Sequence, residues 1–338
     1  MKILFAIQGT GNGHISRAKE ILPHLQKYGD VDVLISGTQA DVFLEQPIAY
    51  LLHGFSFIFG QKGGVDIWKT IKKMKFFRLL ADIKHLPVKN YDLVINDFEP
   101  ISAWACQIRK VPCIALSHQS AFLSPKTPRP AHKSAWAELI FKYYAPCTNR
   151  LSFHFKSYDN YIYTPVIRSE IRALEPKDLG HITVYLPAYA YEFLLSYFEH
   201  IPDVRWQIFS KHCSQAYQQN NVSVRPISNT GFNQSLANAH GLITGGGFEG
   251  PAEALFLGKK LLLIPMKNQY EQYCNAAALA EMGVPVWFDL FQEKAALSKW
   301  IQAHQNIEVN YPEQTNEIIS LIVSNNKFNY LEPFAIHA

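Results

Sequence analysis

The chain has 338 residues, of which 48% are hydrophobic and 18% charged, and its net charge is +4. This composition is typical of a globular protein with room for two domains, and so small a net charge does not indicate a nucleic-acid partner. No uncharged apolar run is long enough to span a membrane, no signal-peptide pattern precedes the first strand, and the five cysteines are scattered. We therefore expect reduced thiols in a cytoplasmic protein.

The first predicted strand, residues 2–8, leads into a glycine turn and then into an amphipathic helix. The turn contains Gly9, Gly11 and Gly13, which do not fit the G-x-G-x-x-G spacing of a dinucleotide site. His14 opens the helix, above the carboxyl ends of a parallel sheet, where ligands usually bind. The helix dipole would favour the neutral imidazole that a general base needs, and a histidine that only caps the turn is the alternative interpretation.

Strand-like and helical runs alternate along the whole chain. Strands are expected at residues 2–8, 31–36, 49–52, 92–96 and 112–116, and in a second series at 182–186, 204–209, 222–225, 241–243 and 261–264. This alternation predicts an α/β protein with two Rossmann-like, mostly parallel sheets that face a central cleft. We expect an N-terminal domain at residues 1–164, a linker at 165–180, a C-terminal domain at 181–324 and a tail at 325–338.

Residues 66–89 are unusually basic and aromatic. Seven lysines and arginines against two aspartates give this segment a charge of +5, and apolar side chains are interleaved with them. Such a helix would suit the anionic surface of a membrane, and the protein would then be peripheral on the inner face of that membrane. A solvated helix with an ordinary core-facing stripe is the alternative.

Polar residues follow the next two strands. Asp97 and Glu99 come after the strand at 92–96 and precede a helix that Pro100 opens. Asp97 would orient His14 or hold an acceptor, or it would simply cap the helix. His118 lies in the segment Ser-His-Gln-Ser after the next strand, and would either reach an acceptor or belong to an internally satisfied loop.

The most informative segment, residues 242–253, predicts an apolar strand, a triple-glycine turn and a helix. Gly245, Gly246 and Gly247 would allow a ligand to approach closely, and the helix start offers free N–H groups and the positive end of the dipole, which suits a diphosphate. Glu249 and Glu253 lie four residues apart on one face of that helix, and Glu253 would accept hydrogen bonds from sugar hydroxyls. A second polar cluster, residues 268–275, follows the next strand.

The two glycine turns and the two Rossmann-like halves together resemble GT-B glycosyltransferases. The segment from Gln8 to His14 is similar to the first loop of the MurG and UDP-glycosyltransferase branch, and the segment from Thr244 to Asn275 is similar to its donor-binding block. MurG's extended first-loop glycine run has no counterpart here. The resemblance is therefore to the fold and the branch.

The resemblance implies roles for individual residues. It implies that His14 is the base near the acceptor, and we place Asp97 beside it as the second catalytic candidate. It also implies diphosphate contacts from the glycine turn, a ribose contact from Glu253, and sugar contacts from the cluster at 268–275. The donor-binding candidates are Ile227, Gly245, Gly246, Gly247, Glu249, Glu253, Asn268, Gln269, Glu271 and Gln272, and the acceptor-side candidates are Thr10, Gly11, Asn12, Gly13, Glu99 and His118.

The expected function is transfer of a sugar from a nucleotide-diphosphate donor, with UDP as the expected nucleotide, to a hydroxyl acceptor that is lipid-linked if the membrane interpretation holds. We expect inversion at the anomeric carbon, no cofactor and no metal, because backbone N–H groups and the helix dipole can carry the charge of the leaving diphosphate. Two alternatives stay open. One is a UDP-sugar hydrolase or 2-epimerase on the same fold, which would need more carboxylates in the cleft, and the other is a non-catalytic nucleotide-sugar-binding subunit.

Overall fold

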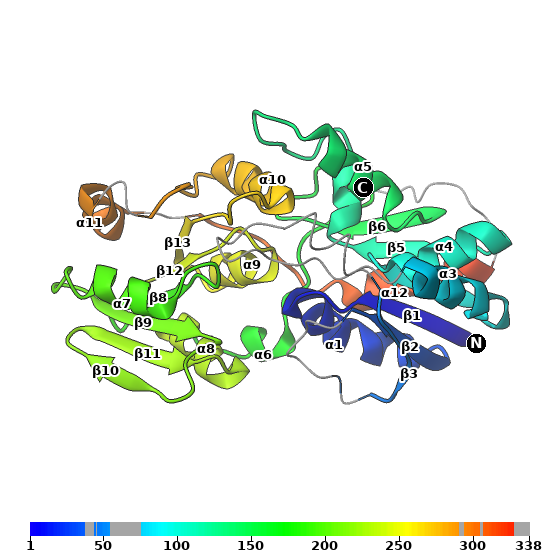
Figure 1. Cartoon of the computed structure of the whole chain (residues 1–338), viewed down its shortest axis with the longest axis horizontal. Helices are drawn as coiled ribbons and strands as arrows, with labels where there is room; N and C mark the ends of the chain where they lie inside the picture. Colours follow the sequence, from blue (N-terminus) through cyan, green and yellow to red (C-terminus); the bar gives the residue numbers. More distant parts are fainter. Residues whose placement is uncertain (38–43, 45, 55–75, 291–293, 305–306, 328–338) are drawn as a thin grey trace.

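The computed structural model describes residues 1–37, 44, 46–54, 76–290, 294–304 and 307–327. Over these ranges the chain forms two lobes, each built on one sheet (Figure 1). The predicted α/β architecture with two mostly parallel sheets is confirmed. Within the same ranges, no helix has the length and apolar character needed to cross a membrane.

The first sheet has the strand order β3-β2-β1-β4-β5-β6-β7, and all of its neighbouring pairs are parallel. Its strands are β1 (Lys2–Gln8), β2 (Asp30–Ser36), β3 (Ile48–Leu52), β4 (Leu93–Asp97), β5 (Ile114–Ser117), β6 (Asn149–Phe153) and β7 (Ile162–Tyr163). The strands expected in this half are present. β6 and β7 were not expected, because β6 begins with two polar residues and β7 is only two residues long.

The second sheet has the order β10-β11-β9-β8-β12-β13. Its strands are β8 (His181–Tyr185), β9 (Arg205–Ser210), β10 (Tyr217–Gln219), β11 (Val222–Pro226), β12 (Gly241–Thr244) and β13 (Lys260–Leu263). The strands of the expected second series are present and parallel. The additional strand, β10, is antiparallel to β11 and fully exposed, so burial leaves no mark on its sequence.

Helices connect the strands and cover the sheets. They are α1 (Asn12–Gln26), α3 (Phe76–His85), α4 (Pro100–Arg109), α5 (Ala135–Tyr143), α6 (Ser169–Arg172), α7 (Tyr191–Phe198), α8 (Asn229–Asn238), α9 (Glu249–Phe256), α10 (Tyr270–Ala280), α11 (Lys294–Gln302) and α12 (Thr315–Lys327), with 3-10 turns η1 (Val88–Asn90) and η2 (Gln119–Leu123). β1 shows why both faces of its sheet are covered. Ile3, Phe5 and Ile7 pack with α1, whereas Leu4 and Ala6 pack with α3 and α4 on the other face.

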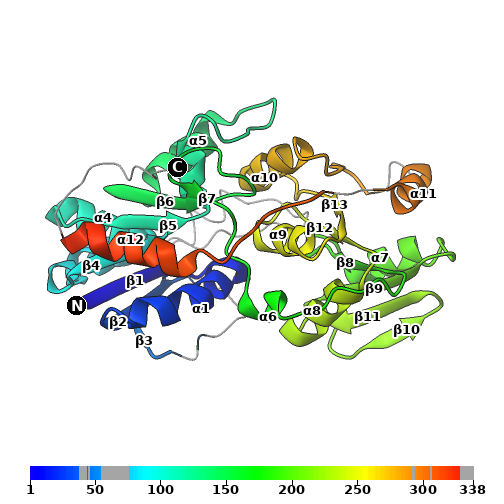
Figure 2. The same cartoon turned by 180° about the vertical axis from the view of Figure 1, so that it is seen from behind.

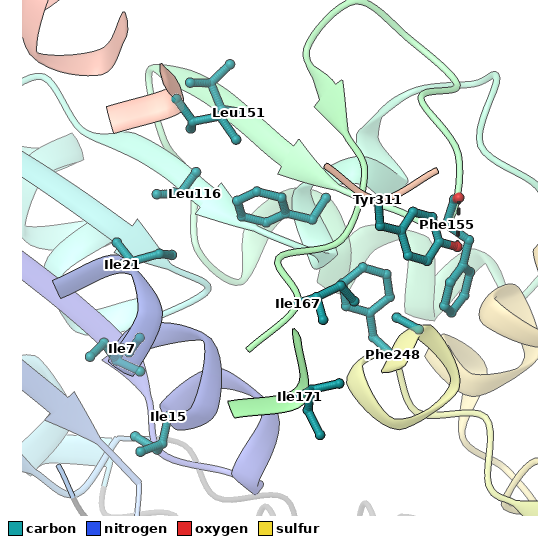
Figure 3. Close-up of a cluster of buried hydrophobic side chains, with 14 of the residues drawn as sticks. Ile7, Ile15, Ile21, Leu116, Leu151, Phe155, Ile167, Ile171, Phe248 and Tyr311 are labelled. Atoms are coloured by element: carbon teal, nitrogen blue, oxygen red, sulfur yellow. Dashed lines mark hydrogen bonds between the residues drawn. The ribbon is translucent and has the colours of Figure 1, made fainter. Parts of the chain in front are cut away.

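The apolar core continues from one half into the other. Phe248, at the start of α9, packs with its ring centroid 5.0 Å from that of Phe155, which follows β6. Ile167 and Ile171, from the segment that joins the sheets, belong to the same core cluster (Figure 3). The two halves are therefore in contact through buried side chains as well as through the connecting chain.

The last described helix, α12, returns to the first half. It packs against α1, and Figure 2 shows it beside the first sheet. The predicted C-terminal domain, residues 181–324, included most of this helix, so its placement differs from the expected division. Ile318, Ile319 and Ile322 are buried, which gives the end of the described chain a structural role in the N-terminal half.

Candidate functional site

A histidine–aspartate pair lies at the carboxyl end of the first sheet. His14 is in the first turn of α1, and Asp97 is the last residue of β4. His14 Nδ1 lies 2.9 Å from Asp97 Oδ1, and Asp97 is 0% exposed. Because an ionised carboxylate only accepts hydrogen bonds, Nδ1 carries a hydrogen, and in the neutral ring Nε2 then holds the lone pair. The 3.2 Å approach of Arg17 NH2 to Nδ1 is then a contact between two donors and not a hydrogen bond. The expected link between these residues is present.

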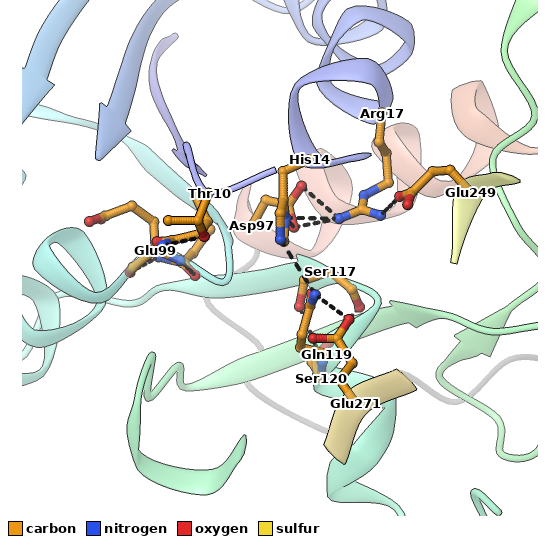
Figure 4. Close-up of polar contacts among 12 residues, drawn as sticks. Thr10, His14, Arg17, Asp97, Glu99, Ser117, Gln119, Ser120, Glu249 and Glu271 are labelled. Carbon is orange, nitrogen blue, oxygen red and sulfur yellow. Dashed lines mark hydrogen bonds and ion pairs between the residues drawn. The ribbon is translucent and has the colours of Figure 1, made fainter. Parts of the chain in front are cut away.

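A buried arginine joins this pair to the second half. Arg17 lies one turn after His14, and its NH2 group donates to both oxygens of Asp97, at 2.7 and 2.8 Å. Its NH1 group donates to Glu249 Oε1 at 2.5 Å, and the Arg17 side chain is 2% exposed (Figure 4). Glu249 is the first residue of α9, so a single guanidinium connects carboxylates from opposite halves.

The surroundings keep both of these groups ionised. Burial alone would raise the pKa of Asp97, but the charge of Arg17 and the hydrogen bonds from His14 and Arg17 outweigh it, and the pKa lies below its usual value. Burial alone would lower the pKa of Arg17, but the charges of Asp97 and Glu249 raise it. Asp97 is therefore ionised at neutral pH, as the tautomer of His14 requires.

The first glycine turn fits the Glu249 carboxylate closely. A Cβ at residue 13 would collide with Glu249 Oε2, so a side chain there would displace the Glu249 carboxylate from its present position. Gly11 has φ of 97°, a value that favours glycine. Thr10 accepts a hydrogen bond from Gln8 Nε2 at 2.9 Å, and α1 begins at Asn12.

Two further polar side chains stand on the Nε2 side of His14. Gln119 Nε2 lies 3.4 Å from His14 Nε2 and donates to Glu271 Oε1 at 3.0 Å. Gln119 Oε1 is buried without a hydrogen-bond partner among the described residues. Burial raises the pKa of Glu271, and Glu249 adds to this rise. His14 Nε2 therefore lies beside the amide of Gln119, which connects it to the Glu271 carboxyl group of the second half.

The second glycine turn is held by two side chains of α10. Gln272 Oε1 accepts hydrogen bonds from Gly246 N at 3.0 Å and from Met266 N at 2.9 Å. Asn275 Nδ2 donates to Gly246 O at 3.0 Å. A Cβ added to Gly247 would meet no atom within 4 Å, so the space over the start of α9 is open at that residue.

Glu253 is engaged differently from the expectation. Arg168, in the segment that joins the two sheets, donates to both of its oxygens, with Nε at 2.5 Å and NH2 at 2.8 Å. Glu253 is 3% exposed. Arg168 also donates to Asn233 Oδ1 at 3.1 Å. This geometry gives Glu253 a structural role at the junction, and the ribose contact that the resemblance implies stays a prediction.

His118 is buried and is enclosed by contacts with neighbouring residues. It is 1% exposed, its Nδ1 lies 2.9 Å from Phe153 O, and its Nε2 lies 2.8 Å from Asn275 Oδ1. Its ring stacks on Phe248 with centroids 3.8 Å apart. Burial lowers the pKa of His118 to about 3. Both ring nitrogens face oxygen acceptors, and a neutral ring donates to only one of them. His118 is therefore enclosed by loop contacts, as the second alternative held, and the neighbouring Gln119 is the residue that reaches His14.

Glu99, not Asp97, caps α4. Its carboxylate accepts hydrogen bonds from Ile101 N at 2.8 Å and Ser102 N at 2.7 Å, and the side chain is fully buried. The alternative in which Asp97 caps this helix is wrong, because Asp97 binds His14 and Arg17. Glu99 correspondingly acts as a helix cap, which differs from the acceptor-side role expected for it.

The other donor-side candidates lie at the carboxyl ends of strands in the second sheet. Ile227 follows β11 and is partly buried. Asn268 is exposed with φ of 61°, and Gln269 precedes α10 as its N-cap residue. Over the described ranges, no group of three or more histidine, cysteine or acidic residues is arranged to hold a metal ion.

Arg17 and Arg168 were not predicted from the sequence, and Gln119 and Asn275 were included only as members of longer polar segments. Arg17 had a usable signal, because residues three apart lie on the same face of a helix and His14 was already a candidate. The partners of the other three come from distant parts of the chain. The contacts of Gln119 with Glu271 and of Asn275 with His118 form only when the two halves meet, and no local pattern predicts them.

The fold and family were compared with known proteins. The model of glycosyl transferase family 1 matches residues 1–304. Similar solved structures include a UDP-glucosyltransferase from Polygonum tinctorium (14% identity, TM-score 0.57, covering 97% of this chain and 93% of that one) and MurG from Acinetobacter baumannii (13%, 0.52, 96% and 100%). A UDP-N-acetylglucosamine 2-epimerase is also similar (14%, 0.52, 100% and 99%). No curated protein sequence matches the chain.

These likenesses confirm the GT-B fold that the two glycine turns predicted, with one Rossmann-like sheet in each half. At such low identity the solved structures establish the fold alone. The family match covers most of the chain and both halves of the site. The chain belongs to glycosyl transferase family 1.

Proposed function

We propose that the chain transfers a sugar from a UDP-linked donor to a hydroxyl acceptor, with inversion at the anomeric carbon and without a metal ion. The observation that carries the proposal is the 2.9 Å contact between His14 Nδ1 and Asp97 Oδ1. It leaves Nε2 as a proton acceptor beside Gln119, which in turn donates a hydrogen bond to Glu271 of the second half. A general base at the boundary between the halves is what an acceptor-activating step needs.

In the proposed reaction, the acceptor oxygen bonds to the anomeric carbon while the bond from that carbon to the diphosphate oxygen breaks. His14 Nε2 takes the proton of the acceptor hydroxyl. The Asp97 carboxylate stabilises the resulting imidazolium, and Arg17 keeps that carboxylate ionised. Attack on the face opposite the leaving group inverts the configuration.

The leaving diphosphate would rest against the triple-glycine turn and the start of α9. Unpaired N–H groups and the helix dipole favour an anion there. The open space at Gly247 supports this location, because a ligand can come close to the backbone. Gln272 and Asn275 fix the turn from α10. Glu271, beside His14 and Gln119, is placed to accept a hydrogen bond from the donor sugar.

The test uses His14→Ala with UDP-sugars as donors. Removing a general base should lower turnover about 10²–10⁴-fold, while UDP affinity stays nearly unchanged because the nucleotide lies in the other half. UDP release and UDP affinity are measured side by side for the wild type and the variant. Wild-type protein that binds UDP but never transfers or hydrolyses a UDP-sugar would indicate a non-catalytic binding subunit instead.

A second candidate is a UDP-sugar hydrolase or 2-epimerase. The observation that favours it is the number of carboxylates near His14, since Asp97, Glu249 and Glu271 all lie in this cluster. Arg17 forms ion pairs with the first two, whereas Glu271 accepts its hydrogen bond from the neutral amide of Gln119, so few carboxylates are left for proton transfer at C2, which favours sugar transfer. Proton NMR of UDP-N-acetylglucosamine in heavy water decides between them. Epimer formation with deuterium at C2 supports the epimerase, and an unchanged donor without acceptor supports the transferase.

The acceptor half also has features that suit an anionic membrane surface. On α3, Phe77 is 86% exposed, and Phe76 and Leu80 are about half exposed. Ile108, on the neighbouring α4, is 65% exposed. Arg78 and Lys84 lie on the same helix and Lys89 lies in η1, whereas the other basic residues of the segment, Lys69, Lys72, Lys73 and Lys75, lie outside the described residues. An apolar face flanked by cations is typical of interfacial binding, so we extend the proposal to a lipid-linked acceptor.

Vesicle sedimentation tests this extension. The protein should bind anionic vesicles and much less neutral ones, and the difference should fade with salt. Phe77→Asp should reduce binding without altering UDP affinity. The matched control is Phe193→Asp, because Phe193 is also an exposed phenylalanine, 51% exposed, but lies on α7 in the second half. Equal sedimentation with both vesicle types would favour a water-soluble acceptor.

A further inference from the structure

Arg17 is the cation that joins the two halves at the proposed catalytic centre. Its guanidinium holds Asp97 of the first half and Glu249 of the second, and the side chain is almost fully buried. The third nitrogen, Nε, is buried without a hydrogen-bond partner among the described residues. Orienting His14 needs only Asp97, so the reach of Arg17 to Glu249 requires a separate explanation.

We propose that Arg17 is a positioning residue for donor binding: it draws the negative charge of Glu249 away from the start of α9 and so keeps that helix end available for an anionic diphosphate. The inference rests on the proposed function, since it concerns the same donor site. It assigns to the acceptor half a side chain that controls the affinity of the donor half.

The position of Glu249 explains why its carboxylate needs a cationic partner. Glu249 is the first residue of α9, and an acidic side chain in the first turn is attracted to the N–H groups and the positive dipole end of its own helix. Those are the groups that a diphosphate would need. Without a partner across the boundary, the Glu249 carboxylate would compete with the ligand for them and would repel it.

The charges of the donor half point the same way. Burial is the main cause of the raised pKa of both Glu253 and Glu271, and the nearby charge of Glu249 adds to both rises. Glu253 already has Arg168 as its counter-ion. Arg17 is the corresponding counter-ion for Glu249, and it leaves the turn at Gly247 clear because it binds from the side of Gly13.

The experiment is a double-mutant cycle on nucleotide binding. UDP affinity is measured calorimetrically for wild type, Arg17→Met, Glu249→Gln and the double variant. Methionine keeps much of the length of arginine without its charge. Arg17→Met should weaken UDP binding at least about tenfold. The Glu249 carboxylate would lose its cationic partner and would repel the diphosphate in a region of low effective dielectric. Glu249→Gln should bind UDP as well as wild type or better, and the double variant should match Glu249→Gln within about threefold.

The UDP affinity of the double variant distinguishes this positioning role from a direct contact with the nucleotide and from a purely structural role. A double variant that binds UDP as weakly as Arg17→Met would overturn the inference, because it would mean that Arg17 contacts the nucleotide itself or only maintains the fold. Arg17→Lys should give an intermediate affinity, since one ammonium cannot hold the oxygens of both Asp97 and Glu249 in the same geometry.

Failure of the proposed function would look different. Wild-type protein that does not bind UDP refutes that proposal whatever the variants do. In that case the melting temperatures of the same four proteins, measured without nucleotide, test whether Arg17 and Glu249 interact directly. A non-additive double variant supports a direct Arg17–Glu249 interaction, and additive effects overturn it.

Discussion

Replacing Asp97 by asparagine removes one charge from the centre of the site with almost no change of shape. In the wild type, the buried carboxylate accepts one hydrogen bond from His14 and two from Arg17. Asparagine presents one oxygen and one amino group in their place. The variant therefore tests both the orientation of His14 and the compensation of Arg17.

The expected effects are large. Leaving a buried ion without its partner costs about 3–5 kcal/mol of unfolding free energy, and because Glu249 still holds Arg17, we expect about 3 kcal/mol. Turnover should fall roughly 10²–10⁴-fold, because the imidazole loses the acceptor that fixes its tautomer and stabilises its charged form. UDP affinity should change little, since Asp97 lies in the acceptor half.

The assay is denaturant unfolding of wild type and Asp97→Asn between about pH 6 and pH 3, with steady-state rates at neutral pH. The pKa of Asp97 is lowered in the folded protein, so the folded state binds this proton less readily than the unfolded state. The stabilisation is therefore complete above the unfolded pKa of about 3.9 and is lost as the pH falls through the lower folded value. The gap between the two proteins should narrow on acidification.

The matched control is Asp178→Asn. Asp178 also pairs with a histidine, His240, but its side chain is 55% exposed, so its removal should cost no more than about 1 kcal/mol. An Asp97→Asn protein as stable and as active as this control would refute the reasoning, because the buried charge would then have no energetic or catalytic role.

Two other predictions concern the contacts between the halves. Arg168→Met should destabilise the protein by about 3–5 kcal/mol, because Glu253 would be buried without its counter-ion. Loss of the exposed partner of Arg168 in Glu170→Gln should cost under about 1 kcal/mol. Equal unfolding free energies for the two variants would contradict this prediction. His118 has a folded pKa of about 3, against about 6.5 when unfolded, so its contribution is complete above about pH 6.5 and is lost as the pH falls below it. His118→Phe keeps a ring against Phe248 and should lose less stability between pH 7 and pH 5 than the wild type, and parallel losses would count against the neutral, buried histidine.

The parts of the fold that the sequence predicted well are those with strong local signals. β1, β4 and β12 are largely apolar runs that stop at a glycine or an acidic residue, and Pro100 marks the start of α4. β10 is exposed on every residue, and β7 has two residues, so neither leaves a pattern of buried positions. The return of α12 to α1 is a long-range packing event that its own amphipathic sequence does not specify.

The residues of the candidate site also divide into those with a local sequence signal and those whose contacts depend on tertiary structure. His14 and Asp97 were predicted because each stands at the carboxyl end of a parallel strand, where side chains from neighbouring strands meet. Glu99 and Asp97 were both acidic residues before a helix, and only tertiary structure decides which one caps it. Arg168 and Glu253 are far apart in sequence, so the pairing of their charges depends on how the two halves dock.

The central claim is that a nucleotide diphosphate binds at the triple-glycine turn, and titration of UDP into wild type and Gly247→Val tests it most directly. A Cβ at residue 247 would meet no atom within 4 Å, so the variant should fold normally, yet its side chain would stand where the diphosphate is expected. Gly250→Ala, also without a neighbour within 4 Å but already inside α9 as its second residue, is the matched control. The account predicts that Gly247→Val keeps its melting temperature and loses UDP binding while Gly250→Ala keeps both. Wild-type affinity for UDP in a correctly folded Gly247→Val protein would contradict it.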